Sequence, residues 1–390
     1  ATAGYMLAKR SRTADPAAAQ IPAASVVAEI FESVSEVACN RLADFVPQGI
    51  SNMVWAFAKV GHKATPLFNA VAKIAVPKLA NFKPQELTNT VYAFAIAEHD
   101  APALFDKAAL EAPSRIEEFR SSNLSNLAWS FARKLHGAPK LFDAIANEVI
   151  VKLELFQPQE VANTVYAFAL MGHSAPLLFE AVAQVVPGRL PEFKAQEFSN
   201  TMWAFAVADA RHPTFLSACM EQVLKSIDTF IPENLVQLHQ VQLWIEHELL
   251  VPELLLPEDV RRKCTETMKK HLATVSGLQA QVAAVLSGLV GSERLEEELV
   301  LECGYSVDLA LLQRQVVIEV DGPSHFRQAG NGGGRIPTGK TYLKCRQLKS
   351  MGWHVLSVPH FDWYDAGDAV GQRAYLERRL EDVAEPLQTL

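Results

Sequence analysis

A self-similarity with a constant period of 37 residues constrains the fold of this chain more than any other sequence feature. An aromatic residue recurs at this interval, with an asparagine three positions before it and a phenylalanine two positions after it. A fixed period of this length is typical of repeat architectures, in which each unit packs mainly on its neighbours. The aromatic series is Trp55, Tyr92, Trp129, Tyr166 and Trp203; the asparagine series is Asn52, Asn89, Asn126, Asn163 and Asn200; the phenylalanine series is Phe57, Phe94, Phe131, Phe168 and Phe205.

Each repeat is predicted to be a pair of helices. The first helix of the first pair spans about residues 48–60, because Ile50, Val54 and Phe57 recur at the spacing of one helix face. The second helix begins at Pro66, since proline suits a first helical position, where its missing N–H would have no partner.

The pattern covers five repeats over residues 45–229, followed by a degenerate sixth at 230–250 that we expect to act as a cap. We therefore predict a mainly α fold, a right-handed α-solenoid of two-helix repeats, followed by a small α/β domain. The expected organisation is a leader and first helix at 1–40, the repeat array at 41–250, a helical connector at 251–292 and the α/β domain at 293–390.

Composition limits the remaining options. No run of about 18 apolar residues occurs, so no membrane-spanning helix is expected. The five cysteines are scattered, which argues against a structural zinc site or a disulfide framework. The net charge of −8 disfavours nucleic-acid binding only as an average, since a basic stripe can lie on an acidic body. The alanine-rich start, with Lys9, Arg10 and Arg12, is compatible with the end of a transit peptide or with a disordered leader.

The C-terminal region changes from helical repeats to an α/β pattern. We predict a helix at residues 293–301, strands at 306–311 and 315–320, a helix at 339–350, and then a strand and a final helix. A two-residue turn at Gln313 and Arg314 would place residues whose numbers sum to 627 opposite each other.

In that register Asp308 faces Glu319, with Cβ atoms about 5 Å apart, and Asp321 shares their side of the sheet. Three carboxylates this close repel one another unless a cation relieves them. The opposite side would carry apolar residues, namely Val307, Leu309 and Leu311 with Val316, Ile318 and Val320.

A basic segment follows the strands, since residues 322–361 contain six lysines and arginines and no acid. Neutralisation of phosphates and stacking on aromatic rings would suit RNA contact, while a solvated helix face is the simpler alternative. The basic residues are Arg327, Arg335, Lys340, Lys344, Arg346 and Lys349. Residues 334–341 also fit the phosphate-binding pattern G-x-x-x-x-G-K-T, but no strand leads directly into Gly334, so we do not expect nucleotide hydrolysis.

Two resemblances sharpen these expectations. The 37-residue motif N-x-x-(W/Y)-A-F-A resembles heptatricopeptide and octotricopeptide repeats, which belong to RNA-binding proteins of mitochondria and plastids. The run V-V-I-E-V-D-G-P-S-H-F at 316–326, with G-W-H-V-L-S-V-P at 352–359, resembles the RAP domain of organellar RNA-processing proteins, including the FAST-kinase-like family. The RAP domain is in turn similar to the PD-(D/E)xK nuclease fold of Vsr-type endonucleases.

The nuclease resemblance implies roles for individual residues. Asp308 would be the first acid and Glu319 the second, together able to hold Mg²⁺ or Mn²⁺, although no cofactor is required for RNA binding. Asp321 stands where a nuclease usually has lysine, so His325, Lys340 or Lys344 would have to supply the missing cation or proton donor.

These observations lead to one main expectation and two alternatives. The chain is expected to bind single-stranded RNA in the mitochondrial matrix, or in a plastid, with ribonucleoprotein partners and an oligomeric state that the sequence leaves open. The asparagine series and the basic residues from Arg327 to Arg346 would contact RNA, although asparagines and aromatics at this spacing can instead pack between repeats. A neighbouring stripe containing Thr90, Thr164 and Thr201 is a second candidate surface. The alternatives are a metal-dependent endoribonuclease using Asp308, Glu319, Asp321 and His325, and a protein–protein scaffold.

Overall fold

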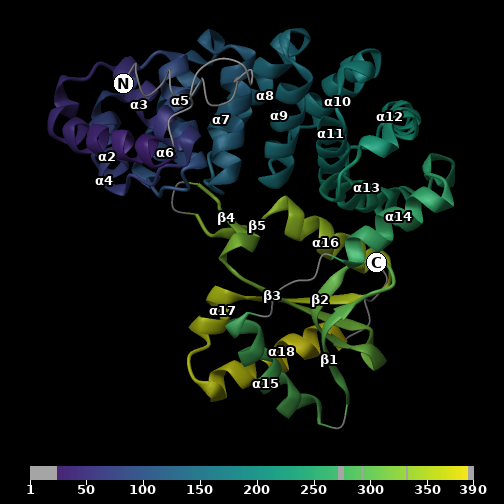
Figure 1. The fold of residues 1–390 in the computed structure, drawn as a ribbon. Helices are drawn as coiled ribbons and strands as arrows, with labels where there is room; N and C mark the ends of the chain where they lie inside the picture. Colours follow the sequence, from purple (N-terminus) through teal and green to yellow (C-terminus); the bar gives the residue numbers. More distant parts are fainter. Residues whose placement is uncertain (1–23, 271–275, 292, 331–332, 385–390) are drawn as a thin grey trace. The chain divides into compact units, whose positions relative to one another are not determined.

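The computed structural model describes residues 24–270, 276–291, 293–330 and 333–384. They divide into two compact units, one within residues 1–185 and 328–334 and the other within residues 186–327 and 335–390. Both units contain helical repeats, and the second also contains the α/β domain (Figure 1).

The first unit consists of helix pairs with the predicted period. Below, the first helix of a pair is called the A helix and the second the B helix. The A helices α3, α5, α7 and α9 lie side by side in one layer, and the B helices α4, α6, α8 and α10 form a second layer against them (Figure 1). The helices are α2 (Ala24–Arg41), α3 (Pro47–Val60), α4 (Thr65–Ala75), α5 (Pro84–Ile96), α6 (Pro102–Glu111), α7 (Ser121–Arg133), α8 (Pro139–Lys152), α9 (Pro158–Leu170) and α10 (Pro176–Val185).

Buried phenylalanines hold the two layers together. Phe68 of α4 meets Phe94 of α5 edge to face with ring centroids 4.9 Å apart, and Phe142 of α8 meets Phe168 of α9 in the same way at 4.9 Å. Edge-to-face pairs suit the charge distribution of aromatic rings, and full burial of each ring contributes about 1.5–3 kcal/mol. The B helix of one repeat is thereby fixed to the A helix of the next.

The histidine after each A helix has a structural role. His62 lies just beyond the A helix, because α3 ends at Val60 and Gly61 reverses the chain with φ +69°. His62 packs between Phe31 and Phe57, and its Nε2 lies 3.2 Å from a carboxylate oxygen of Glu32 on the preceding B helix. Equivalent contacts join His99 to Asn69, His136 to Asp106 and His173 to Asp143.

The second unit begins with the last repeats and continues into the α/β domain. Its helices are α11 (Ala195–Ala208), α12 (Pro213–Ser226), α13 (Pro232–Trp244), α14 (Glu258–Lys269), α15 (Gly277–Val290), α16 (Gly339–Ser350), α17 (His360–Asp365) and α18 (Ala369–Ala384). Its strands are β1 (Leu295–Val300), β2 (Ser306–Leu311), β3 (Val316–Asp321), β5 (Arg335–Pro337) and β6 (His354–Pro359). β4 (Phe326–Gln328) pairs with β5 in a two-stranded ribbon.

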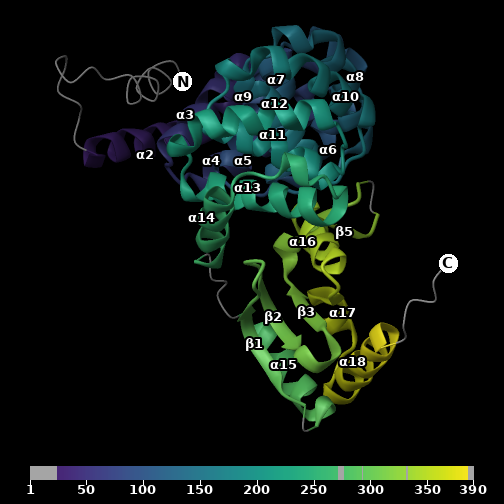
Figure 2. The same ribbon diagram turned by 90° about the vertical axis from the view of Figure 1, so that its right-hand side faces the viewer.

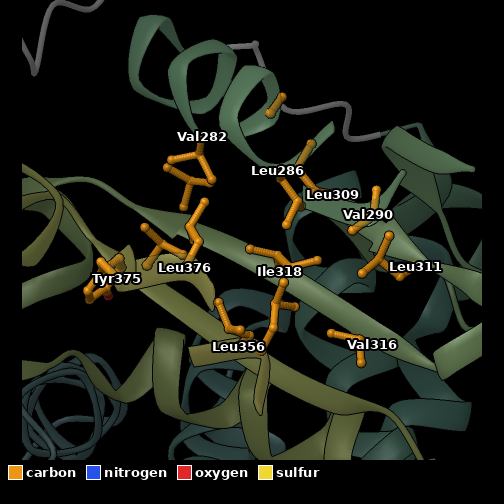
Figure 3. Close-up of a cluster of buried hydrophobic side chains, with 14 of the residues drawn as sticks. Val282, Leu286, Val290, Leu309, Leu311, Val316, Ile318, Leu356, Tyr375 and Leu376 are labelled. Atoms are coloured by element: carbon orange, nitrogen blue, oxygen red, sulfur yellow. The ribbon is translucent and has the colours of Figure 1, made fainter. Parts of the chain in front are cut away.

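The main sheet is mixed, with the strand order β1-β2-β3-β6 and β6 parallel to β3. One face is covered by α15 and α18, where Leu286 and Leu376 pack on Ile318 (Figure 3). On the other face, Val317 belongs to a buried cluster with Leu348 of α16, Leu243 of α13 and Met268 of α14. The course of these three helices can be followed in Figure 2. The strand β3 is therefore buried on both sides, which explains its nearly continuous apolar sequence.

The predicted pairing of β2 with β3 is confirmed in register, since Leu309 faces Ile318 and Leu311 faces Val316. The predicted two-residue turn is wrong, because a short 3-10 helix over Leu312–Arg314 and Gln315 at φ +52° form a longer connection. The predicted side of Val307 is also wrong, as it packs with the opposite cluster. In β2 the regular alternation of side chains between the two faces of the sheet is interrupted at Asp308. Its carboxylate accepts a hydrogen bond from the backbone N–H of Val320 in β3.

The prediction of a helix at residues 293–301 is wrong. The segment forms β1, which pairs antiparallel to β2 from Leu295 opposite Leu311 to Val300 opposite Ser306. Its three consecutive glutamates favour a helix in isolation, but the open edge of β2 offers backbone partners and apolar contacts for Leu295 and Leu299. Tertiary pairing thus overrides local propensity here.

The predicted fold class is confirmed, with helical repeats followed by a small C-terminal α/β region built on a mixed sheet. The helix predicted at 339–350 coincides with α16. Within the part of the chain that the structure describes, no helix combines the length and the apolar character needed to cross a membrane.

Candidate functional site

The first candidate site is a stripe along the A helices of the first unit, which we call the amide–aromatic stripe. It comprises one asparagine and one aromatic residue from each repeat, namely Asn52 and Trp55, Asn89 and Tyr92, Asn126 and Trp129, and Asn163 and Tyr166. All eight side chains are half-buried. They lie three residues apart on each helix, so every repeat presents the pair at the same place.

The asparagine amides of this stripe do not hold the repeats together. Among the described residues, the side chains of Asn52, Asn89, Asn126 and Asn163 make no hydrogen bond to another protein group. The alternative of an asparagine ladder bonded to neighbouring repeats therefore does not describe the first unit. Each amide retains two N–H donors and a carbonyl acceptor for water or a ligand.

The aromatic residues of the stripe pack partly on one another. The rings of Tyr92 and Trp129 lie 5.3 Å apart between centroids, and Lys59 Nζ lies 5.0 Å from the ring centroid of Tyr92 and 5.7 Å from that of Trp55. Burial raises the pKa of the Tyr166 phenol. These rings are thus partly covered by packing, and each remains partly exposed.

The second stripe considered from sequence is not a surface. Thr90, Thr164 and Thr201 are buried, as are Met53 and Leu127 at the equivalent positions. Each threonine hydroxyl donates to the carbonyl one turn earlier, for example from Thr90 Oγ1 to the oxygen of Glu86 at 2.8 Å. This position points into the helix layer, so the threonine stripe is ruled out as a contact surface for RNA.

The fifth repeat, in the second unit, uses the same residue types differently. Asn200 accepts a hydrogen bond of 3.0 Å from Gln237, which stands 37 residues later. Trp203 is buried, and its indole N–H donates to Gln240 at 2.8 Å. Gln240 in turn donates to the Tyr305 hydroxyl, which donates to Gln347 of α16 at 2.6 Å. The last repeat is therefore bonded to the α/β domain through a buried polar network.

The second candidate site is a carboxylate cluster on the main sheet. Glu319 and Asp321 are almost fully buried on β3, at 3% and 1% exposure. Asp308 on β2 accepts a 2.7 Å hydrogen bond from the backbone N–H of Val320, which lies between them. The three carboxylates lie around one cleft, although the paired register of β2 and β3 ends at Leu309 and Ile318 and does not include Asp308 opposite Glu319.

Two basic side chains and a hydroxyl offset this buried negative charge. Lys344 Nζ lies 2.5 Å from Glu319 Oε2, and His325 Nδ1 lies 2.7 Å from Asp321 Oδ1. The Ser357 hydroxyl on β6 donates to the other oxygen of Asp321. Of the three residues considered from the sequence, Lys344 thus pairs with Glu319 and His325 with Asp321.

Burial controls the protonation of the cluster. It raises the pKa of Glu319 to about 7, although the Lys344 ammonium opposes the rise. It also raises the pKa of Asp308, against the lowering effect of the Val320 N–H. Within the described residues, Glu319 Oε1 is buried and has no hydrogen-bond partner. An unpaired buried carboxylate oxygen is costly unless a proton, cation or ligand meets it.

A cleft of about 720 Å³ lies over the cluster. Its walls come from α13, α14, the sheet and α16, all within the second unit. The carboxylates Asp308, Glu319 and Asp321 line it together with His325, Lys340 and Lys344. Lys340 is exposed at the start of α16, whose first turn is capped by the side chain of Thr338.

The remaining predicted cations divide into engaged and exposed groups. Arg346 is engaged within the protein, since it pairs with Glu248 at 2.6 Å and donates to the carbonyls of Ala206 and Val207 at the end of α11. Arg327 is half-buried, and burial lowers its pKa. Arg335 is exposed and lies over the Phe361 ring at 4.8 Å. Only some of the predicted basic residues therefore face solvent.

A metal ion would find few ligands here. Across the described residues, no group of three or more histidine, cysteine, aspartate or glutamate side chains is arranged to hold one. Within the described residues, Asp321 Oδ1 makes no hydrogen bond and has only its ion pair with His325, while Glu319 Oε1 and one oxygen of Asp308 have neither. Magnesium sites of enzymes often use one or two carboxylates together with substrate phosphates, so two oxygens fit an ion that arrives with its substrate.

The comparisons with known proteins agree with both parts of this geometry. Residues 318–379 match the RAP domain. Residues 28–239, more than half of the chain, match the family described as RNA-editing substrate-binding complex 6 protein. The chain belongs to this family and carries a RAP domain. The two matches support an RNA-binding role.

One curated relative adds to this assignment. A chloroplastic RAP domain-containing protein of Oryza sativa subsp. japonica is 37% identical over 78 residues. The aligned segment covers 20% of this chain and only 11% of the relative. The similarity therefore concerns a short segment of the rice protein, whose function as a whole is not carried over.

Some residues around the RAP domain cluster could not be identified from the sequence. Ser357 reaches Asp321 only because β6 pairs parallel to β3, and no local motif marks that register. Gln279 of α15 donates to Glu298 of β1 and to the backbone oxygen of Asp308, which links a connector helix to the cluster. A separation of 19 or more residues between these partners leaves no periodic signal.

Proposed function

We propose that this chain is an organellar RNA-binding protein that holds single-stranded RNA along the amide–aromatic stripe, with the RAP domain contacting the same RNA. The observation that carries the proposal is the series of asparagine side chains on α3, α5, α7 and α9 that make no hydrogen bond to any residue that the structure describes. Four such groups at one position in successive repeats form an ordered row of donors and acceptors.

This chemistry suits unpaired bases. Single-stranded RNA exposes the hydrogen-bonding edges and flat faces of its bases, which repeat proteins read with two or three side chains per repeat. An asparagine amide can both donate to and accept from a base edge, and the accessible edge of a neighbouring Trp or Tyr can contact a base. A duplex hides these edges, so the stripe should prefer single strands.

The RAP domain offers cations for the backbone of the strand. Lys340 lies at the rim of the cleft, and Arg335 stacks on Phe361 with its guanidinium exposed. A planar guanidinium on an aromatic ring suits both phosphate and base contact. We expect Lys344, Arg346 and Arg327 to contribute less, because the protein already uses or partly covers them.

A binding experiment on the full chain tests this function. Labelled single-stranded RNA should bind more tightly than a duplex of the same sequence, and affinity should fall steeply with salt. Combined substitution of Asn52, Asn89, Asn126 and Asn163 by alanine should reduce affinity at least tenfold, about 1.4 kcal/mol. The matched control is Asn147→Ala, an exposed asparagine on the B helix α8, which should leave affinity unchanged.

The opposite results would favour other functions. Equal binding by the quadruple variant would remove the stripe from the RNA interface. A flat or absent response of the wild type to RNA at any salt concentration would favour the protein–protein scaffold instead.

Metal-dependent RNA cleavage is a second candidate function, which the unpartnered oxygen Glu319 Oε1 favours. Glu319 and Asp308 would hold Mg²⁺ or Mn²⁺ beside a substrate phosphate, where the ion would stabilise developing charge. Lys344 would oppose protonation of Glu319, and His325, half-exposed and anchored on Asp321, would face the cleft as the proton donor.

Cleavage can be tested apart from binding. Labelled RNA is incubated with Mg²⁺ or Mn²⁺ and with either wild type or Asp308→Asn, which keeps the size of the side chain. If the wild type cleaves RNA only with metal and the variant is slower by a factor of about 100 or more, the nuclease function is supported. Equal background in both proteins discards it and leaves RNA binding intact.

We also propose an organellar location. The repeat motif resembles those of mitochondrial and plastid proteins, and the rice relative is chloroplastic by name. Mitochondrial matrix remains our first choice, with the plastid as the alternative. Protease protection of the full-length natural protein in isolated organelles distinguishes them, and a protein found only outside both would contradict the proposal.

A further inference from the structure

A second, longer period runs through the repeats of the first unit. The residue four positions after each stripe aromatic alternates between a cation and an aliphatic side chain, in the order Lys59, Ile96, Arg133 and Leu170. The aromatic itself alternates in step, with Trp in the first and third repeats and Tyr in the second and fourth. The buried position beneath alternates as Met53, Thr90, Leu127 and Thr164. Three positions changing together define a two-repeat unit.

The first cation lies on the stripe between two repeats. Lys59 Nζ is 5.7 Å from the ring centroid of Trp55 in its own repeat and 5.0 Å from that of Tyr92 in the next. A lysine placed over two aromatic faces is held near one position, since the rings attract the ammonium group. Its charge therefore lies close to the aromatic rings of two successive repeats.

The second cation stands at the equivalent position of the sequence two repeats later. Arg133 stands four residues after Trp129, and its charge opposes the effect of burial on the Tyr166 phenol in the next repeat. Its guanidinium also pairs with Glu98 at 2.5 Å, with the arginine 51% and the glutamate 70% exposed. An ion pair this exposed contributes little to stability, so a phosphate can replace the carboxylate at small cost.

We propose that the repeats hold single-stranded RNA in steps of two repeats, with Lys59 and Arg133 each neutralising one backbone phosphate. The repeats with Ile96 and Leu170 contact the strand only through Asn89 with Tyr92 and Asn163 with Tyr166. Neighbouring helices pack about 8–10 Å apart, so the two phosphates would lie about 16–20 Å apart along the stack. This inference rests on the proposed RNA-binding function and adds which repeats contact the phosphates of the RNA.

The adjacent residue Lys134 provides a matched control. It pairs with Asp100 at 2.5 Å and also donates to the backbone oxygen of Glu98, with only 17% of its side chain exposed. It differs from Arg133 by one position and so lies off the stripe. If only the loss of a positive charge mattered, substitution of Lys134 or of Arg133 would lower RNA affinity equally. If Arg133 contacts a phosphate, only its substitution should do so.

The test is the dependence of RNA affinity on salt, measured with labelled single-stranded RNA and the full chain. Each phosphate contact to a single strand adds about 0.7 to the slope of log affinity against log salt. Lys59→Gln and Arg133→Gln should each lower the slope by about 0.7, and the double variant by about 1.4. Lys134→Gln should leave the slope unchanged, and Lys59→Arg should restore it.

A gain-of-charge variant guards against the possibility that a loss reflects damaged folding. Ile96→Lys places a cation at the same point of an intervening repeat, where it should raise the slope, because the strand passes that repeat. Unchanged slopes in Lys59→Gln, Arg133→Gln and Ile96→Lys, with steep wild-type binding, would overturn the two-repeat register and leave the proposed function standing. Absence of wild-type RNA binding would overturn both.

Discussion

Lys344 on α16 and Glu319 on β3 form an ion pair with 2.5 Å between Nζ and Oε2. The pair crosses from helix to sheet at the centre of the RAP domain and supplies the cation that the neighbouring position Asp321 cannot. Glu319 nevertheless keeps its second oxygen without a partner among the described residues. The cluster is therefore only partly compensated, which makes its protonation a sensitive probe of the site.

Glu319→Gln should change how stability depends on pH. The pKa of Glu319 is raised to about 7 from 4.5, chiefly by burial, so the folded protein retains a proton that the unfolded chain releases. The free energy of unfolding should then fall as pH rises through this window, and the variant should lack this fall, by up to about 3 kcal/mol between pH 4.5 and 8. Urea unfolding of both proteins at several pH values measures this change in the free energy of unfolding. The exposed Glu297→Gln is the control, and parallel pH profiles for wild type and Glu319→Gln would contradict the burial argument.

Arg346→Gln should destabilise the protein without changing the salt dependence of RNA binding. The guanidinium pairs with Glu248, which is 8% exposed, and donates to carbonyls at the end of α11. Removing one partner of a buried pair costs about 3–5 kcal/mol, because the other charge is left uncompensated. Lys349→Gln, exposed on the same helix, should cost under about 0.5 kcal/mol. A reduced salt slope in Arg346→Gln at unchanged stability would show that this arginine contacts RNA after all.

Gly137→Ala should loosen the ribbon tip that packs on the third repeat. A Cβ at Gly137 would lie 2.0 Å from the backbone oxygen of Gln328, whose own N–H donates to Leu135. Backbone cannot yield as a flexible side chain does, so we expect a loss of about 1–3 kcal/mol and faster proteolysis near Gln328. Gly188→Ala meets no atom within 4 Å and is the matched control. Identical proteolysis of both variants would argue against this contact.

Trp203→Phe and Trp129→Phe should have opposite consequences, although both residues occupy the same repeat position. Trp203 is buried and donates to Gln240, so its loss leaves a buried acceptor unpaired and costs about 1–3 kcal/mol. Trp129 is half-buried on the stripe, so its substitution should weaken RNA binding more than it lowers stability. Thermal unfolding and RNA titration of both variants measure the two effects. Equal loss of stability in both would remove the distinction between the fifth repeat and the others.

The repeat array was predictable because its signal is periodic and local. The 37-residue spacing locates A and B helices, and prolines such as Pro66 locate the start of the second helix within a residue or two. The pairing of β2 with β3 was likewise predictable, since apolar alternation fixes register whenever one side is buried. The prediction for residues 293–301 failed because the partner strand, and not local propensity, determines β1.

The candidate site was predictable only where its residues lie close in sequence. Asp308, Glu319 and Asp321 belong to two strands joined by a short connection, and Asp308 reaches the backbone N–H of Val320, between the other two. The engagement of Arg346 with the end of α11 spans 139 residues, and no pattern in the basic segment distinguishes it from the exposed Arg335. Similarly, only packing shows that the threonine position is buried while the asparagine position beside it is not.

Ultraviolet crosslinking of the full chain to single-stranded RNA, followed by mass spectrometry of the peptides, locates the RNA on the protein. We expect crosslinks on the A helices α3, α5, α7 and α9, at or beside Trp55, Tyr92, Trp129 and Tyr166, together with peptides at the start of α16. Crosslinks confined to the B helices, or to the RAP domain alone, would contradict the claim that the repeats hold the RNA along the amide–aromatic stripe.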